Sequence, residues 1–242
     1  MRRRMMASQT PETAHCRFST STLSSAGMKN LLLAALTTAL LCAGATAQDP
    51  DGLRARALAE LKSDSVTLRR QAYEALGQAG LHEDLPVLYA ALYDADPGIR
   101  EIAQTSIWRV WGRSGDAGAD QAYQVGVMQM ERGLLRAAVR TFSALIDSRP
   151  DFTEAWNKRA TVYYLLEEDD LSIADCEEVL KRNPHHFGAL SGFGQLMLRR
   201  GEPERALDYF ERALVINPNL DGVRASIELL KRLLLDRGKR LI

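Results

Sequence analysis

The sequence predicts an all-α protein, folded as a right-handed α-solenoid of stacked helix–turn–helix repeats. Three observations predict this fold. Three similar phrases end in Pro150, Pro184 and Pro218, so these prolines are spaced twice by 34 residues. A different repeat with an offset of 31 residues precedes them, and the alternating pattern of β-strands is almost absent. A fixed period of this length is typical of helical hairpins that bury their apolar faces only by stacking on their neighbours.

The composition is that of a globular protein, with 46% hydrophobic and 26% charged residues among 242. The formal net charge is zero, but it is unevenly distributed. Residues 1–47 contain five Arg or Lys residues and one Glu, a net charge of +4, so residues 48–242 carry −4. A mildly acidic body without a clustered basic face argues against a nucleic-acid partner.

The N-terminus has the pattern of an export signal. Residues 31–44 are an uncharged stretch, shorter than the roughly 20 residues that a transmembrane helix needs. Met28 and Lys29 precede this stretch, and a small-x-small cleavage site follows it. The first 47 residues are therefore predicted to be a leader, in which residues 28–47 are the signal peptide, cleaved after Ala47.

Residues 1–27 are rich in Arg, Ser and Thr. They are either an over-long start, with Met28 as the initiator, or a transit peptide ahead of the signal; the complete signal start at Met28 favours the first alternative. Leu41 precedes Cys42, where a lipoprotein signal has a small residue, which argues against lipid attachment. The predicted location is the periplasm or the extracellular medium, with no membrane span after cleavage.

Residues 116–218 are predicted to hold three repeat units, at 119–152, 153–186 and 187–218. Their eighth residues are Gly126, Ala160 and Gly194. Their twenty-fourth residues are Phe142, Cys176 and Phe210. A small eighth residue lets the two helices of a unit approach closely, and Cys176 is predicted to be a small buried apolar filler.

The turns inside the units differ. Gly133 and Gly201 stand between the two helices of units one and three, where glycine accepts a positive φ. Unit two has Glu167 at this point. We therefore expect Asp169 or Asp170 to cap its second helix.

Over residues 119–218 the units resemble the tetratricopeptide repeat (TPR) family, whose W-x2-L-G-x2-Y…A-x3-F…P pattern they carry in scattered form. The matching residues are Trp156, Tyr163, Gly194, Ala206, Phe210, Ala213 and Pro218. We expect Trp156 to be a core residue. The resemblance implies that the first helices of successive units line a concave groove that holds peptides.

The groove positions follow from the resemblance. The partner-binding candidates are Tyr123, Val127, Met130, Asn157, Lys158, Thr161, Tyr164, Gln195 and Arg199, and the other inward positions are Asp120, Glu154, Ser191 and Gly192. One TPR subfamily clamps a C-terminal carboxylate with Lys and Asn. The corresponding positions here hold Tyr123, Val127, Gly188 and Gly192, so that mode of binding is not expected.

Residues 48–115 carry the repeat with the 31-residue offset. The matched pairs are Leu68 with Ile99, Arg69 with Arg100, Ala72 with Ala103, and Leu76 with Ile107. Short helices are predicted before these phrases, at 53–61 and 85–93. The segment resembles two HEAT repeats; a generic four-helix stretch is the alternative. The short join at 114–118 favours packing of both arrays into one continuous α-solenoid.

Residues 219–242 are predicted to form a C-terminal capping helix that ends near Gly238. Its apolar residues recur at helical spacing, at Val223, Ile227, Leu230 and Leu234. Several basic residues leave a helix on a membrane surface as an alternative. A cap is favoured because the last repeat of a solenoid needs one.

No motif for catalysis or for a cofactor is found. The adjacent His185 and His186 are predicted to lie in a solvated turn between units, because no further metal ligands are suitably spaced. Trp108 and Trp111 are three residues apart and are predicted to be core residues where the two arrays meet. We expect no metal site and no enzymatic activity.

These inferences predict an exported, non-catalytic adaptor or scaffold that binds a protein or peptide through the concave groove. One alternative is an accessory subunit of an envelope protease or of a cell-wall-remodelling enzyme. Another is a self-assembling structural module. The sequence leaves the oligomeric state open.

Overall fold

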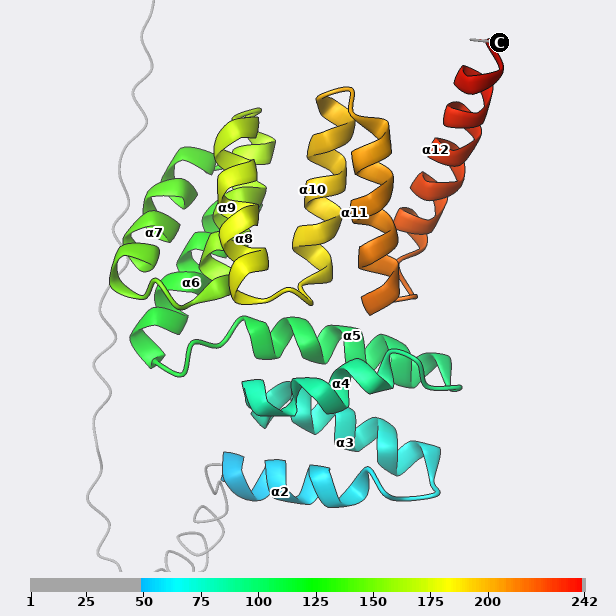
Figure 1. Ribbon diagram of the computed structural model, residues 1–242. Coiled ribbons are helices and arrows are strands. Elements are labelled where there is room, and N and C mark those ends of the chain that lie inside the picture. Colours follow the sequence, from blue (N-terminus) through cyan, green and yellow to red (C-terminus); the bar gives the residue numbers. More distant parts are fainter. Residues whose placement is uncertain (1–48, 241–242) are drawn as a thin grey trace, which may run out of the picture. The chain divides into compact units, whose positions relative to one another are not determined.

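The computed structural model describes residues 49–240, and the predicted leader and signal peptide lie outside these residues. Between Asp49 and Arg240 the chain forms eleven α-helices and a short 3-10 turn, without a β-strand (Figure 1). The all-α fold is therefore confirmed. The first elements are α2 (Pro50–Glu60), α3 (Val66–Ala79), η2 (His82–Asp84), α4 (Leu85–Ala91) and α5 (Pro97–Trp111). The repeat hairpins are α6 (Ala117–Glu131) with α7 (Leu135–Ser148), α8 (Thr153–Leu165) with α9 (Asp169–Arg182), and α10 (Phe187–Arg199) with α11 (Pro203–Ile216). The last helix is α12 (Asp221–Arg240).

Several helices begin at polar caps that the sequence places there. The side chains of Ser65, Asp96 and Asp116 each accept a hydrogen bond from the backbone N–H three residues later, at 3.4, 2.9 and 2.8 Å. Such caps satisfy an amide that has no partner within the helix. Pro97 and Pro203 occupy the first turns of α5 and α11, where a missing N–H costs little.

The 31-residue repeat is visible in matching contacts. Arg69 and Arg100 each extend back to the turn before their helix. Arg69 Nη1 donates to the carbonyls of Ser63 and Asp64 at 3.1 and 3.2 Å, and Arg100 Nη1 donates to those of Asp94 and Ala95 at 2.9 and 3.1 Å. Because all three residues of each contact are offset by 31 positions, the repeat in the sequence is also a repeat in the geometry.

The two pairs of helices differ in burial. Ile99 in α5 is fully buried, whereas the matched Leu68 in α3 is 40% exposed. The deeper positions agree, since Leu76 and Ile107 are both fully buried. The matched positions therefore agree in burial in the interior of α3 and α5 and differ in the first turn of each helix.

The three hairpins keep the spacing that the small residues predict. Phe142 and Phe210 are fully buried, and a Cβ atom placed on Gly126 or Gly194 would collide with these rings. Cys176 occupies the same position in the second hairpin and is also buried. The assignment of these positions to the core is confirmed.

The turns inside the hairpins differ from the prediction at one point, the cap of α9. Gly133 and Gly201 both have a φ of +72°, and Glu167 adopts a φ of +60° at the equivalent turn. Helix α9 begins at Asp169, and Glu168 before it makes no side-chain cap hydrogen bond. The prediction that Asp169 or Asp170 caps the helix is therefore wrong. Both carboxylates form ion pairs with arginines of α10 and its C-terminal turn, Asp169 with Arg199 and Asp170 with Arg200.

Trp156 is also not the core residue that was predicted. It is half-buried, with one side packed against the first hairpins. Its indole Nε1 donates to the carbonyl of Pro150 at 3.1 Å. The guanidinium groups of Arg182 and Arg159 lie 4.7 and 5.1 Å from its ring centroid.

The two arrays share a core. In Figure 1, α5 runs across the ends of α8, α10 and α11. Phe187 at the start of α10 is buried among residues of α2 to α5, and its ring lies 4.9 Å from that of Trp111. Polar bonds extend the junction, since Asn219 Nδ2 donates to the carbonyl of Leu92 at 2.8 Å and Asn217 Nδ2 donates to Gln104 Oε1 at 2.6 Å. The prediction that Trp111 is a core residue at this junction is confirmed.

Helix α12 packs against α11 and buries Ile227 and Leu230 in the core of the third hairpin. It extends to Arg240, close to the end predicted near Gly238. Its outer side exposes Leu229 and Leu233. Within residues 49–240 no helix is both long enough and apolar enough to span a bilayer.

Candidate functional site

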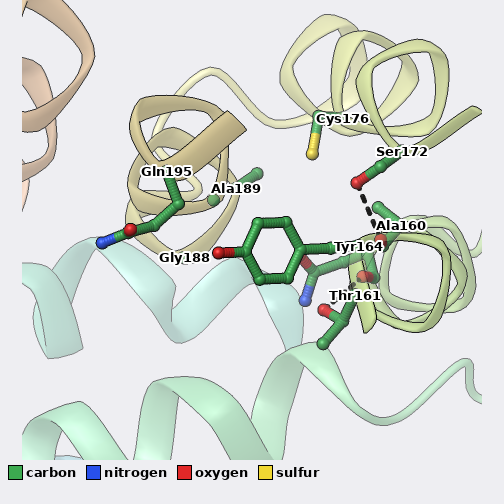
Figure 2. Close-up of a pocket in the computed structure, with 10 residues that line it drawn as sticks. Ala160, Thr161, Tyr164, Ser172, Cys176, Gly188, Ala189 and Gln195 are labelled. Carbon is green, nitrogen blue, oxygen red and sulfur yellow. Dashed lines mark hydrogen bonds between the residues drawn. The ribbon is translucent and has the colours of Figure 1, made fainter. Parts of the chain in front are cut away.

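A cleft of about 100 Å³ lies between α8 and α10, with α9 behind it (Figure 2). Its lining comes from the second hairpin and from the first helix of the third. The lining residues are Asn157, Ala160, Thr161, Tyr164, Ser172, Cys176, Gly188, Ala189, Gly192 and Gln195. None of these side chains is an acid or a strong base. The surface is mostly apolar, with polar groups at a few points.

The small residues of the lining have structural causes. A side chain at position 188 would collide with Trp108 of α5, so glycine is required where the two arrays touch. By contrast, a Cβ atom on Gly192 would meet nothing within 4 Å. The missing side chain at Gly192 therefore opens the cleft without being needed for packing.

The floor of the cleft is formed by α9. Ser172 Oγ donates to the carbonyl of Ala160 at 2.8 Å, which ties α9 to α8. Burial raises the pKa of the Cys176 thiol to about 12, so the thiol stays protonated and is a poor nucleophile at neutral pH. This confirms the prediction that Cys176 is an apolar filler.

The aromatic side of the cleft is Tyr164, whose ring extends from α8 toward α10 in Figure 2. The Arg199 guanidinium lies 3.7 Å from the ring centroid, a cation–π contact. Arg199 Nη1 also donates to the Tyr164 carbonyl at 3.1 Å and to Asp169 Oδ1 at 2.7 Å. These contacts fix the Tyr164 ring and compensate the arginine charge.

The buried carboxylate of Glu154 lies at the other end of the cleft, near the N-terminal ends of α8 and α10. Glu154 is 1% exposed and accepts a hydrogen bond from Asn157 Nδ2 at 2.9 Å. Its other oxygen lies 2.9 Å from His186 Nε2, and Lys158 Nζ lies 3.4 Å from the oxygen that Asn157 contacts. Burial opposes the charge, but the bonds from His186 and Asn157 and the Lys158 charge outweigh it, so the pKa of Glu154 lies below its usual value. Glu154 engages one of the two N–H donors of Asn157 Nδ2, so Asn157 can offer its second N–H and its Oδ1 to a ligand.

His186 corrects the prediction of a solvated histidine turn. Its side chain is 1% exposed, whereas His185 is exposed. Nδ1 accepts from the backbone N–H of Ala189 at 3.0 Å, so the ring proton is on Nε2 and is donated to Glu154. The ring stacks on Trp111 with centroids 4.0 Å apart. The available signal was the position of His186 directly before a helix, where a side-chain acceptor caps the first turn.

The structure brings together part of the predicted groove. Four of the nine candidates line the cleft, namely Asn157, Thr161, Tyr164 and Gln195. Lys158 and Arg199 are not among the lining residues; Lys158 pairs with Glu154, and Arg199 lies over the ring of Tyr164. A binding role for these six residues stays a prediction.

The candidates of the first hairpin lie elsewhere. Tyr123 is buried between Phe142 and Phe152, with ring centroids 6.1 and 5.4 Å away, and burial raises the pKa of its hydroxyl. Val127 and Met130 pack partly buried against the same core. None of these three residues lines the cleft, and the end of α5 at Gly112 lies beside the Tyr123 ring. Their contact with a partner stays a prediction.

Within residues 49–240, no group of three or more His, Cys, Asp or Glu residues is arranged to hold a metal ion.

Comparison with known proteins supports the assignment of the repeats. The family profile described as tetratricopeptide repeat matches residues 129–181 and 170–221. A TPR repeat-containing protein of Rhizobium etli is 32% identical over 125 residues, which cover 52% of this chain and 61% of that protein. The DnaJ homolog subfamily C member 3 of Homo sapiens is 27% identical over 104 residues, 43% of this chain and 21% of that protein. The matched part thus spans less than two thirds of either relative.

Among solved structures, the first TPR of Spaghetti (RPAP3) bound to the HSP90 peptide SRMEEVD has a TM-score of 0.47 and 20% identity, and the match covers 48% of this chain and 93% of that one. YrrB, a TPR protein with an unusual peptide-binding site, has a TM-score of 0.44 and 15% identity over 84% of this chain and 89% of that one. The profile match and the repeat-containing relatives together support the tetratricopeptide repeat family for residues 129–221.

Proposed function

We propose that this protein is a non-catalytic adaptor or scaffold that binds a peptide segment of another protein in the cleft between α8 and α10. One observation carries the proposal. Residues of two different units, selected from their repeat positions alone, line the same cleft: Asn157, Thr161, Tyr164 and Gln195.

The chemistry of the cleft suits a peptide. An extended peptide brings main-chain donors and acceptors, which need partners when water is displaced. Asn157 offers its Oδ1 as an acceptor, and the exposed Gln195 offers both a donor and an acceptor. The apolar remainder of the lining suits a side chain of the peptide.

The α2–α5 segment, which we propose to be HEAT-like, serves as a support for this cleft. Trp108 and Trp111 pack against His186 and Phe187 at the start of α10. The start of α10 is therefore anchored in a second core, which reduces the entropy lost when a peptide binds.

Export is part of the proposal and rests on the sequence pattern of residues 28–47. The protein would act in the periplasm or outside the cell, as secreted bacterial TPR proteins do. Mass spectrometry of the protein from fractionated cells tests this. A mature N-terminus at Gln48 is expected, and a full-length chain confined to the cytosol would contradict export.

The binding proposal is tested by probing an array of immobilised 15-residue peptides with the purified protein. We expect Tyr164→Ala and Gln195→Ala to lower the affinity for bound peptides at least tenfold, with unchanged helicity by circular dichroism. Gln124→Ala is the matched control, because Gln124 is an exposed glutamine on α6, outside the cleft. If both cleft variants bind as the wild type does, the cleft is not the binding site.

Self-assembly is a second candidate, favoured by exposed apolar residues at one end of the repeat array and by an open cleft at the other. Leu229 and Leu233 on α12 are 59% and 55% exposed. An open cleft of about 540 Å³ between α6 and α7 includes Ala122 and Leu145 in its lining. Solution mass over a concentration series tests this, with Leu229→Glu expected to abolish any increase with concentration.

A further inference from the structure

The cleft lies where the other two hairpins are filled. In the first hairpin the Phe142 ring covers Gly126, and in the third the Phe210 ring covers Gly194. Both phenylalanines are fully buried, so neither hairpin has free space at this point.

The second hairpin has a smaller residue at the phenylalanine position, and it has no glycine at the position facing it. The position 34 residues from each phenylalanine is Cys176, and the residue facing it is Ala160. Both line the cleft. The cleft is therefore only part of the space that a phenylalanine ring occupies in the neighbouring units, because Ala160 adds a methyl group where those units have glycine.

We propose that this pocket receives one aliphatic side chain, Val, Leu, Ile or Met, of a bound peptide; the inference rests on the proposed function and specifies its ligand. The size argues for this class. A buried apolar cavity of about 150 Å³ holds benzene, and this pocket is smaller, at about 100 Å³, so a branched or linear aliphatic group fits it better than an aromatic ring.

The absence of a free charge around the pocket also favours an aliphatic side chain. No lining residue is charged, and the ionic groups that contact lining residues are already paired: Arg199, on the Tyr164 ring, with Asp169, and Glu154, bonded to Asn157, with Lys158. A charged side chain of the peptide would lose its hydration in the pocket and find no opposite charge, which is strongly unfavourable. An uncharged aliphatic side chain only gains from leaving water.

Two variants close the pocket by independent routes. Cys176→Phe combined with Ala160→Gly recreates the pair found in the first and third hairpins, and its ring should occupy the pocket without a clash. Gly192→Leu places a side chain at the wall of the cleft, where a Cβ atom meets nothing within 4 Å. Gly222→Leu is the matched control, since Gly222 in α12 is equally free of neighbours and lies outside the cleft.

The probe is the 15-residue peptide array, followed by substitution of each position of the bound peptides with Leu, Met, Ala, Phe and Asp. We expect one position to accept Leu and Met, while Ala, Phe or Asp there weakens binding by roughly 30-fold or more. Both cleft variants should lose at least tenfold in affinity with unchanged circular dichroism, and Gly222→Leu should bind as the wild type.

The outcomes separate the two proposals. If the wild type binds peptides but no position requires an aliphatic residue, or if Gly192→Leu binds as Gly222→Leu does, the inference is overturned and the proposed function stands. If the wild type binds no peptide in the array, the proposed function fails and the inference with it. Should the double variant lose its helicity, Gly192→Leu and the substitution series decide.

Discussion

The second hairpin, α8–α9, and the third, α10–α11, keep the same 34-residue register with different chemistry. In the third, the rings of Phe193 and Tyr209 stack with centroids 4.4 Å apart and 7° between their planes. The positions 34 residues earlier are Arg159 and Asp175, which are joined by two hydrogen bonds of 2.8 Å. The register therefore determines which positions face each other, and it leaves open whether the contact is aromatic or ionic.

Two further differences distinguish the second hairpin. Its floor residue is Cys176 in place of Phe210, and its turn residue is Glu167 in place of Gly201. The second hairpin thus has less buried aromatic surface and a less favourable turn, and the cleft is located there. The second hairpin therefore lacks the fully buried ring of its neighbours at the place where the proposed binding cleft lies.

The largest effect is expected from truncating the residue at the phenylalanine position of each hairpin. Phe210→Ala should lower the free energy of unfolding by about 3–5 kcal/mol, because it removes a fully buried ring. Cys176→Ala should cost no more than about 1 kcal/mol, because little buried volume is lost. Urea unfolding of both variants measures the contrast, and equal losses would mean that the floor of the second hairpin is packed as tightly as that of the third.

The second-largest effect is expected for the ionic contact between Arg159 and Asp175. Asp175→Ala should cost about 3 kcal/mol, because it leaves the half-buried Arg159 without its main partner. Asp175→Ala together with Arg159→Leu should recover much of this loss, because an apolar pair suits the same positions in the third hairpin. Unfolding midpoints of the single and double variants decide, and no recovery in the double variant would show that the second hairpin depends on the charges themselves.

The buried carboxylate of the second hairpin makes its stability depend on pH. Glu154→Gln should cost about 2 kcal/mol at pH 7, because it weakens hydrogen bonds to a charged group. The pKa of Glu154 is lowered by folding, so its contribution is complete above the unfolded pKa of about 4.3 and is lost as the pH falls through the lower, folded value.

The measurement is urea unfolding of wild type and Glu154→Gln between pH 7 and pH 3. The difference between the two proteins should shrink below about pH 4.3. Other carboxylates, such as Asp175, affect both proteins equally and cancel in the difference. A difference that stays constant with pH would mean that Glu154 does not carry its charge in the folded protein.

The smallest effect concerns the turns. Glu167→Gly should stabilise the protein by about 0.5–1 kcal/mol, because glycine adopts a positive φ without the strain of a side chain. Gly201→Ala should destabilise it by about 1 kcal/mol for the same reason. Thermal unfolding of the two variants should therefore shift in opposite directions. If Glu167→Gly also destabilises, the glutamate makes a compensating contact.

The sequence was sufficient for the features that depend on local periodicity. The prolines at a period of 34 predicted the hairpins, and the glycines facing Phe142 and Phe210 predicted their close approach. Both features follow from contacts inside one unit, which a repeat displays three times. The burial of Cys176 was predicted in the same way.

What could not be predicted depends on contacts between distant parts of the chain. His186 is buried because Trp111, 75 positions earlier, stacks on it, and no periodic pattern links the two. Tyr123 packs between Phe142 and Phe152, and the end of α5 adds a contact from outside the repeats, although its repeat position is an inward one. The cleft residues were found because the second and third hairpins do follow the regular stack.

The ties between α8 and α10 are unequal at the two ends of the cleft. At the N-terminal ends of both helices, the rigid imidazole of His186 joins Glu154 to Ala189 in a dry interior. At the C-terminal ends, the long and flexible Arg199 joins α10 to the Tyr164 carbonyl at the surface. When α8 and α10 move apart, the hinge should therefore lie at His186. A ligand of the cleft should enter and leave at the end where Arg199 lies.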